Sequence, residues 1–62
     1  MMTPRQCREQ SAECMRLSNQ APLESEARVL KDIAHSWTRL AGQIDRYQTL
    51  VRESALLRRE AS

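Results

Sequence analysis

A chain of 62 residues holds at most one small domain, which leaves no room for a cofactor-binding fold. Forty per cent of the residues are apolar, but one Trp, one Tyr and no Phe supply little aromatic core. Folding therefore needs a further source of stability, such as a disulfide, a metal ion or a second chain. Ten basic and eight acidic residues give a net charge of +2, which is too balanced to require a nucleic acid or an anionic membrane as partner.

The apolar residues also bear on where the chain works. No stretch approaches the roughly 20 consecutive apolar residues that span a bilayer, and the first residues lack the apolar segment of a signal peptide. We therefore expect a cytoplasmic protein with no membrane partner. In a reducing compartment the two cysteines are expected to be free thiols.

The first predicted helix covers about residues 4–18. Thr3 is placed as its N-cap, Pro4 as its first residue, and Gln6 as the return partner of a capping box. The end is predicted at Ser18, because Asn19 tolerates the left-handed conformation that often closes a helix and a proline follows at position 22.

The second predicted helix covers about residues 22–59 and begins at Pro22. Its apolar residues keep helical spacing through Gly42, so a continuous helix is expected, and a break there giving three helices is the alternative. The fold class is therefore all-α: one domain over residues 1–62, folded as an antiparallel hairpin with a short first helix and a long second helix.

A heptad-like pattern along the second helix and an inward side of the first helix predict the hairpin core. With a tight turn at Gln20, Cys14 is expected opposite Ala27, Cys7 opposite Ala34, and Pro4 opposite Trp37. The predicted hairpin core is Cys7, Cys14, Leu17, Leu30, Ile33, Trp37 and Leu40.

The difference in helix length predicts self-association. The first helix is about 22 Å long and the second about 57 Å, so the second has an uncovered apolar stripe beyond Ala41. We expect antiparallel packing of the C-terminal halves of two long helices in a four-helix-bundle-like homodimer, with a tetramer as the extension. The predicted oligomer interface is Ile44, Tyr47, Leu50, Val51 and Leu57.

No catalytic, cofactor or metal site is predicted. Cys7 and Cys14 are separated by about 10.5 Å of helix rise, too far for a disulfide within the helix, and they are interpreted as small core residues. A redox switch or inter-chain disulfide is the alternative. His35 lies on the outer face, away from the thiols, and Glu9 and Glu13 are interpreted as part of a solvated charged face. The chain is therefore expected not to be an enzyme.

Nucleic-acid binding is the second function that the sequence leaves open. Arg28, Lys31, Arg39, Arg46 and Arg52 follow the second helix, but acidic residues such as Asp45 and Glu53 interleave with them. A nucleic-acid-associated regulator would need the arginine rows of an assembled oligomer. The preferred function is a non-enzymatic, self-associating helical interaction module.

Two segments carry a resemblance to known proteins. Residues 7–17, CREQSAECMRL, and residues 34–41, AHSWTRLA, resemble short uncharacterised bacterial proteins that share a C-R-x-x-x-x-E-C-x-x-L helix and a W-x-x-L-A helix. The resemblance implies a bacterial helical hairpin and no chemical activity. That group often has an acidic residue before the proline of the turn, where this chain has Ala21, so its second helix lacks a side-chain cap.

Overall fold

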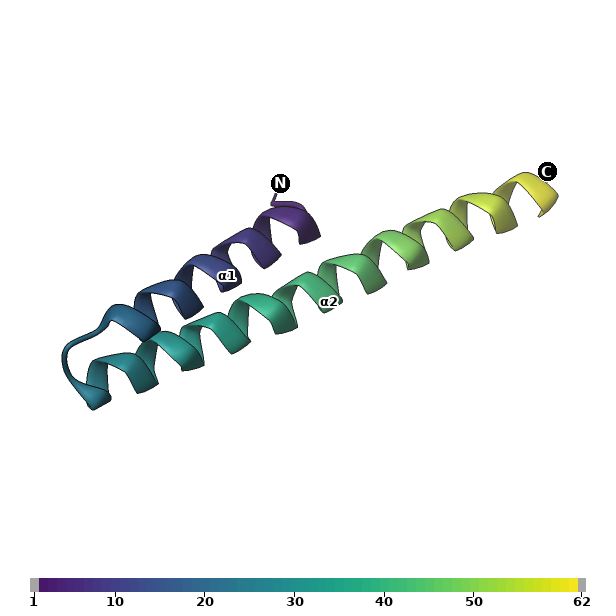
Figure 1. Ribbon diagram of the computed structural model, residues 1–62. Helices are drawn as coiled ribbons and strands as arrows, with labels where there is room; N and C mark the ends of the chain where they lie inside the picture. The colour runs from purple at the N-terminus through teal and green to yellow at the C-terminus, as the bar shows by residue number, and fades with distance from the viewer. Residues whose placement is uncertain (1, 62) are drawn as a thin grey trace.

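The fold is an antiparallel hairpin of two helices. A computed structural model describes residues 2–61; Met1 and Ser62, which the predicted domain includes, lie outside the described residues. Helix α1 is Pro4–Gln20 and helix α2 is Glu24–Ala61, and there is no strand within the described residues. The predicted all-α class and the short and long helices are thus confirmed. The molecule measures 60 × 14 × 13 Å, because the C-terminal half of α2 extends beyond the N-terminal end of α1 (Figure 1).

The capping box predicted at the start of α1 is confirmed. The Gln6 amide donates to Thr3 Oγ1 at 3.1 Å, and the Thr3 amide donates to Gln6 Oε1 at 2.9 Å. The end of α1 differs from the prediction: the helix runs through Ser18 and Asn19 to Gln20, and no residue of the described chain adopts a positive φ. Ala21 ends the helix in an extended conformation, since the residue before a proline is disfavoured in the helical region.

Helix α2 begins two residues later than predicted. Pro22 and Leu23 form the bend, and the first helical hydrogen bond runs from the Ala27 amide to the Leu23 carbonyl at 3.0 Å. Leucine cannot cap the exposed amides with its side chain, but Glu24 and Glu26 in the first turn interact favourably with the helix dipole. The helix extends to Ala61, two residues past the predicted end.

Helix α2 continues through Gly42 without interruption, as predicted. A Cβ at Gly42 would meet no atom within 4 Å, so no close approach requires glycine there. The apolar spacing on either side maintains the helix.

The pairing register of the two helices differs from the prediction. Ser11, rather than Cys7, lies at Ala34: its hydroxyl donates to the Ala34 carbonyl at 2.8 Å and lies 2.8 Å from Thr38 Oγ1. Arg8 Nη2 lies 2.8 Å from Asp45 Oδ2. Helix α1 is therefore displaced by one to two helical turns toward the C-terminus of α2. The cause is the turn: α1 runs to Gln20, and the first residues of α2 lie beyond its end (Figure 1).

The contact between the helices is lined mainly by small residues. Cys7, Ser18, Ala34 and Ala41 are buried, with 0 to 4% of their surface exposed. Half-buried residues complete the line at alternating steps of three and four residues. We call this contact the α1–α2 seam; it comprises Cys7, Ser11, Cys14 and Ser18 of α1 and Ala27, Leu30, Ala34, Trp37, Ala41, Ile44 and Gln48 of α2.

Three residues predicted in the hairpin core lie outside the seam. Leu17, Ile33 and Leu40 are 38%, 41% and 37% exposed. Alanines on α2, and not the larger residues one position before them, face α1. Small side chains allow the two backbones to approach, as the hydrogen bond from the Ser11 hydroxyl to a main-chain carbonyl of α2 shows. Cys7, Cys14, Leu30 and Trp37 do lie in the seam.

Candidate protein-association surface

Helix α2 has a second apolar face that α1 does not cover. Leu40 comes one residue before the buried Ala41, so its side chain is rotated by about 100° from the seam. The same relation holds for Ile33 and Ala34. We call this the open face; it comprises Val29, Ile33, Ser36, Leu40, Gln43, Tyr47, Leu50, Ser54 and Leu57, which recur with heptad spacing. Its large apolar residues are 37 to 65% exposed.

Four of the five residues predicted at the oligomer interface are exposed on the uncovered half of α2. Tyr47 is 57% exposed, Leu50 55%, Val51 50% and Leu57 65%. The fifth, Ile44, is half-buried in the α1–α2 seam, because the observed register brings α1 as far as Asp45. Leu56, also 57% exposed, lies on a different side of α2 from Leu57 and was absent from the prediction.

Shallow depressions follow the open face. One is lined by Ile33, Ser36, Trp37 and Leu40, which are residues i, i+3, i+4 and i+7 of one helix. Four residues with this spacing form the hole that receives a side chain of a facing helix in coiled coils. Two further depressions lie before and after it on α2; they are lined by Ser25, Glu26, Val29 and Leu30, and by Tyr47, Leu50, Val51, Ser54, Ala55 and Arg58.

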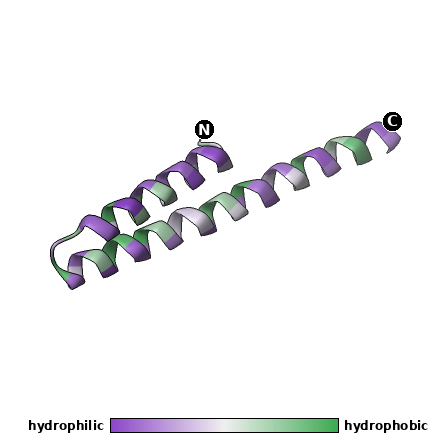
Figure 2. Ribbon diagram, in the orientation of Figure 1, coloured by the Kyte–Doolittle hydropathy of each residue, from purple (hydrophilic) through white to green (hydrophobic). Residues whose placement is uncertain are grey.

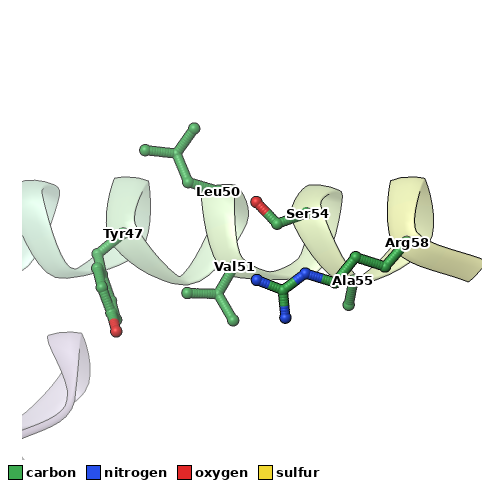
Figure 3. Close-up of a pocket in the computed structure, with 6 residues that line it drawn as sticks. All are labelled: Tyr47, Leu50, Val51, Ser54, Ala55 and Arg58. Atoms are coloured by element: carbon green, nitrogen blue, oxygen red, sulfur yellow. The ribbon is translucent and has the colours of Figure 1, made fainter.

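Figure 3 shows the last of these depressions. Leu50 and Ser54 lie along one edge, Val51 and Ala55 lie along the other, and the Arg58 guanidinium extends back toward Val51. A further depression, lined by Arg52, Ala55, Leu56 and Arg59, lies on another side of α2 and outside the open face. The open face therefore has the spacing and the apolar character of a helix-binding surface.

Among residues 2–61, the thiols and carboxylates form no arrangement typical of catalysis. Cys7 is buried and Cys14 half-buried, both as free thiols on α1, while His35 is exposed on α2. Glu9 lies 3.3 Å from Arg5, and Glu13 pairs with Arg16, whose hydrogen bonds lower the pKa of the Glu13 carboxyl. A carboxyl group that acts as a general acid needs a raised pKa. The pKa of Glu13 is lowered, which is the opposite direction. Over residues 2–61, no three His, Cys, Asp or Glu side chains lie close enough together to hold a metal ion.

The basic residues of α2 are interleaved with acidic ones. Arg28 Nη2 lies 3.9 Å from Glu24 Oε1, and Arg39 and Arg46 share a line along the helix with Glu53. This mixture does not make a uniformly basic face that would follow a phosphate backbone. Hydrophilic and hydrophobic segments likewise alternate along α2 toward its C-terminal end (Figure 2).

Comparisons of the chain with protein-family models, with curated proteins and with solved structures give no match. Neither helix, over the part of the chain that the structure describes, is both long and apolar enough to cross a membrane. The open face of α2 and its large exposed apolar residues are therefore the features from which a function is inferred.

Proposed function

We propose that the protein is a non-enzymatic, self-associating helical interaction module, in which α2 binds a second copy of the chain. One observation carries the proposal: Tyr47, Leu50 and Leu57 are more than half exposed on the open face, the side of α2 that α1 does not cover. A contiguous apolar stripe of this kind is typical of an association surface.

The size of the chain supports the same proposal. The residues in the described part that are nearly or fully buried are small ones, namely Cys7, Ser18, Ala34 and Ala41, so one hairpin buries little apolar surface. Removing a leucine side chain from water stabilises a protein by about 1.5–3 kcal/mol. Leu50 and Leu57 of two chains can supply this energy only when the chains associate.

A homodimer is the simplest assembly that covers the stripe. Two copies related by a twofold axis bring the same surface of each into contact. An antiparallel contact of the C-terminal halves places one α1 at each end and gives a four-helix-bundle-like dimer. A tetramer would form if the dimer retained a further exposed apolar face.

Light scattering coupled to size-exclusion chromatography tests the proposal. At micromolar concentration we expect a mass of twice 7.2 kDa, together with the helical circular dichroism spectrum of the folded chain. Dilution is expected to lower the mass and the helical signal together, since folding and association are coupled. A stable, folded monomer at micromolar concentration would refute the proposal.

A further inference from the structure

A line of charged residues borders the open face of α2. It recurs every seven residues, and its sign changes twice: the acidic Asp32 is followed by the basic Arg39 and Arg46, and these are followed by the acidic Glu53 and Glu60. We call these five exposed residues the charged flank; they are Asp32, Arg39, Arg46, Glu53 and Glu60.

The charged flank lies on the side of the open face away from α1. Arg39, Leu40 and Ala41 are consecutive, so their side chains are rotated in turn by about 100° around the helix. Ala41 faces α1 and Leu40 belongs to the open face, which leaves Arg39 on the far border. A helix that packs on the open face therefore meets the charged flank without displacing α1.

The charges of the flank form no ion pair with another described residue of the hairpin. Ion pairs join Arg5 to Glu9, Arg8 to Asp45, Arg16 to Glu13 and Arg28 to Glu24, but within residues 2–61 the structure shows none for the five residues of the charged flank. Charges that border an apolar helix face usually select the partner and its orientation in helix pairs.

We propose that the open face binds a second copy in an antiparallel register in which Arg46 faces Glu53, and Arg39 faces Glu60, of the other chain. This inference rests on the self-association proposed above and specifies its geometry. Both pairs are symmetric about a point between Thr49 and Leu50, so one twofold axis forms all four ion pairs of the dimer. A parallel, in-register pair would instead place the two charged flanks on opposite sides of the contact, where Arg39 and Arg46 could not reach Glu53 and Glu60 of the other chain.

The apolar residues of the open face support nearly the same register. A twofold axis one residue away, between Gln48 and Thr49, places Tyr47 opposite Leu50 and Leu40 opposite Leu57 of the other chain. The two long helices then overlap over about 40 Å. Each α1 covers its own α2 only as far as about Gln48, on its own side of the axis, so the two short helices do not overlap along the bundle.

The charge pattern identifies the occupant as a second copy. A twofold axis between Thr49 and Leu50 pairs both basic residues of the flank, Arg39 and Arg46, with acidic residues of the other chain. The sequence is therefore complementary to itself in this orientation. Exposed ion pairs add little affinity individually, but like charges in contact oppose association. The charged flank thus determines orientation and partner choice, while the open face supplies the apolar contact.

Paired charge reversals test this geometry. Arg39→Glu with Arg46→Glu makes the charged flank wholly acidic; Glu53→Arg with Glu60→Arg makes all but its first residue basic. We expect each double variant alone to dimerise about tenfold or more weakly at low salt, and an equimolar mixture to recover dimerisation as a heterodimer. All four reversals together restore the pairing and should recover the homodimer. Native mass spectrometry distinguishes these species by mass.

A matched control reverses two basic residues elsewhere on α2. Lys31→Glu with Arg52→Glu changes the net charge as much as the arginine reversals do, and we expect it to leave dimerisation unchanged. Circular dichroism, at a concentration high enough for each variant to associate, verifies that it folds. If the native chain dimerises while the charge-reversed chains dimerise equally well, the antiparallel register is wrong and the proposed self-association stands. If the native chain is a folded monomer, the self-association itself is wrong.

A distance measurement tests the orientation independently of the charges. A spin label at His35→Cys, in a chain with Cys7→Ala and Cys14→Ala, lies on an exposed position away from the open face. The antiparallel register separates the two labels of a dimer by about 44 Å along the helix axes. A separation near the width of two packed helices, about 20 Å, would establish a parallel pair and overturn the proposed register.

Discussion

The two halves of α2 carry apolar residues of different size. Opposite α1, the seam is lined by small side chains: Ala34 is 1% and Ala41 2% exposed. Beyond α1, the apolar residues are large and remain in water, and Leu50 is 55% and Leu57 65% exposed. Small residues hold the hairpin because they let the backbones approach, whereas the large residues contribute only when another surface covers them.

The largest expected effect comes from removing the apolar residues of the uncovered half. We expect Leu50→Gln with Leu57→Gln to raise the dimer dissociation constant by roughly 100-fold or more, because four leucines per dimer lose their burial. Glutamine keeps the charge and the helix propensity. Sedimentation equilibrium measures the constant.

Leu56→Gln is the matched control, since Leu56 is equally apolar but lies on another side of α2. The dissociation constant of this variant should stay within about twofold of the native value, which is a small change in binding free energy. Equal weakening by Leu56→Gln would show that general hydrophobicity, and not the open face, drives association.

The covered half is expected to be sensitive to added volume. Ala34→Leu inserts a large side chain where the Ser11 hydroxyl contacts the Ala34 carbonyl, and we expect it to lower the free energy of unfolding by about 1–3 kcal/mol. Urea unfolding at one fixed protein concentration measures the change. The exposed Ala12 of α1 is the control, because Ala12→Leu adds the same volume to the surface. A loss no larger than that of Ala12→Leu would contradict close packing in the seam.

The same contrast explains what the sequence could and could not predict. The capping box of Thr3 and Gln6 and the continuous helix through Gly42 depend on local spacing, and both predictions are confirmed. The register depends on how α1 ends and on which face of α2 packs more closely, which no local pattern specifies.

The choice of packing face accounts for the residues that were placed incorrectly in the core. A heptad that favours large residues selects Ile33 and Leu40, whereas the structure packs Ala34 and Ala41 against α1. The hydroxyls of Ser11 and Ser18 indicated this, since small polar residues on an inward line suit close helix contacts. Ser18 donates to the Met15 carbonyl at 2.7 Å, so its burial leaves no unpaired hydroxyl.

A smaller effect is expected at Gly42, close to the boundary between the two halves. Its missing Cβ faces open space in a regular helix, so Gly42→Ala should raise the free energy of unfolding by about 1 kcal/mol through helix propensity. Thermal and urea unfolding at fixed concentration measure it. The dimer dissociation constant should fall by no more than this gain in helix stability accounts for. A destabilised Gly42→Ala chain would indicate that a second chain approaches Gly42 closely in the dimer.

The smallest expected effect is the pH dependence of one surface ion pair on α1. Arg16 donates hydrogen bonds to both carboxylate oxygens of Glu13, which lowers the pKa of the Glu13 carboxyl. Because this pKa is lower in the folded chain than in the unfolded chain, the pair stabilises the fold above the unfolded pKa. That contribution is lost as the pH falls through the folded pKa. Both side chains are about half exposed, so the effect on stability is small.

Carboxyl-resolved NMR titration measures this shift directly. We expect Glu13 to titrate below its ordinary value of 4.5 in the native chain and to return toward that value in Arg16→Gln, where the cationic donor is absent. Added salt should reduce the difference between the two chains, since exposed charges are screened. Because the pair lies on α1 and outside the open face, Arg16→Gln should leave the dimer dissociation constant unchanged. A native Glu13 that titrates at its ordinary value would contradict the ion pair, and a changed dissociation constant would extend the association surface to α1.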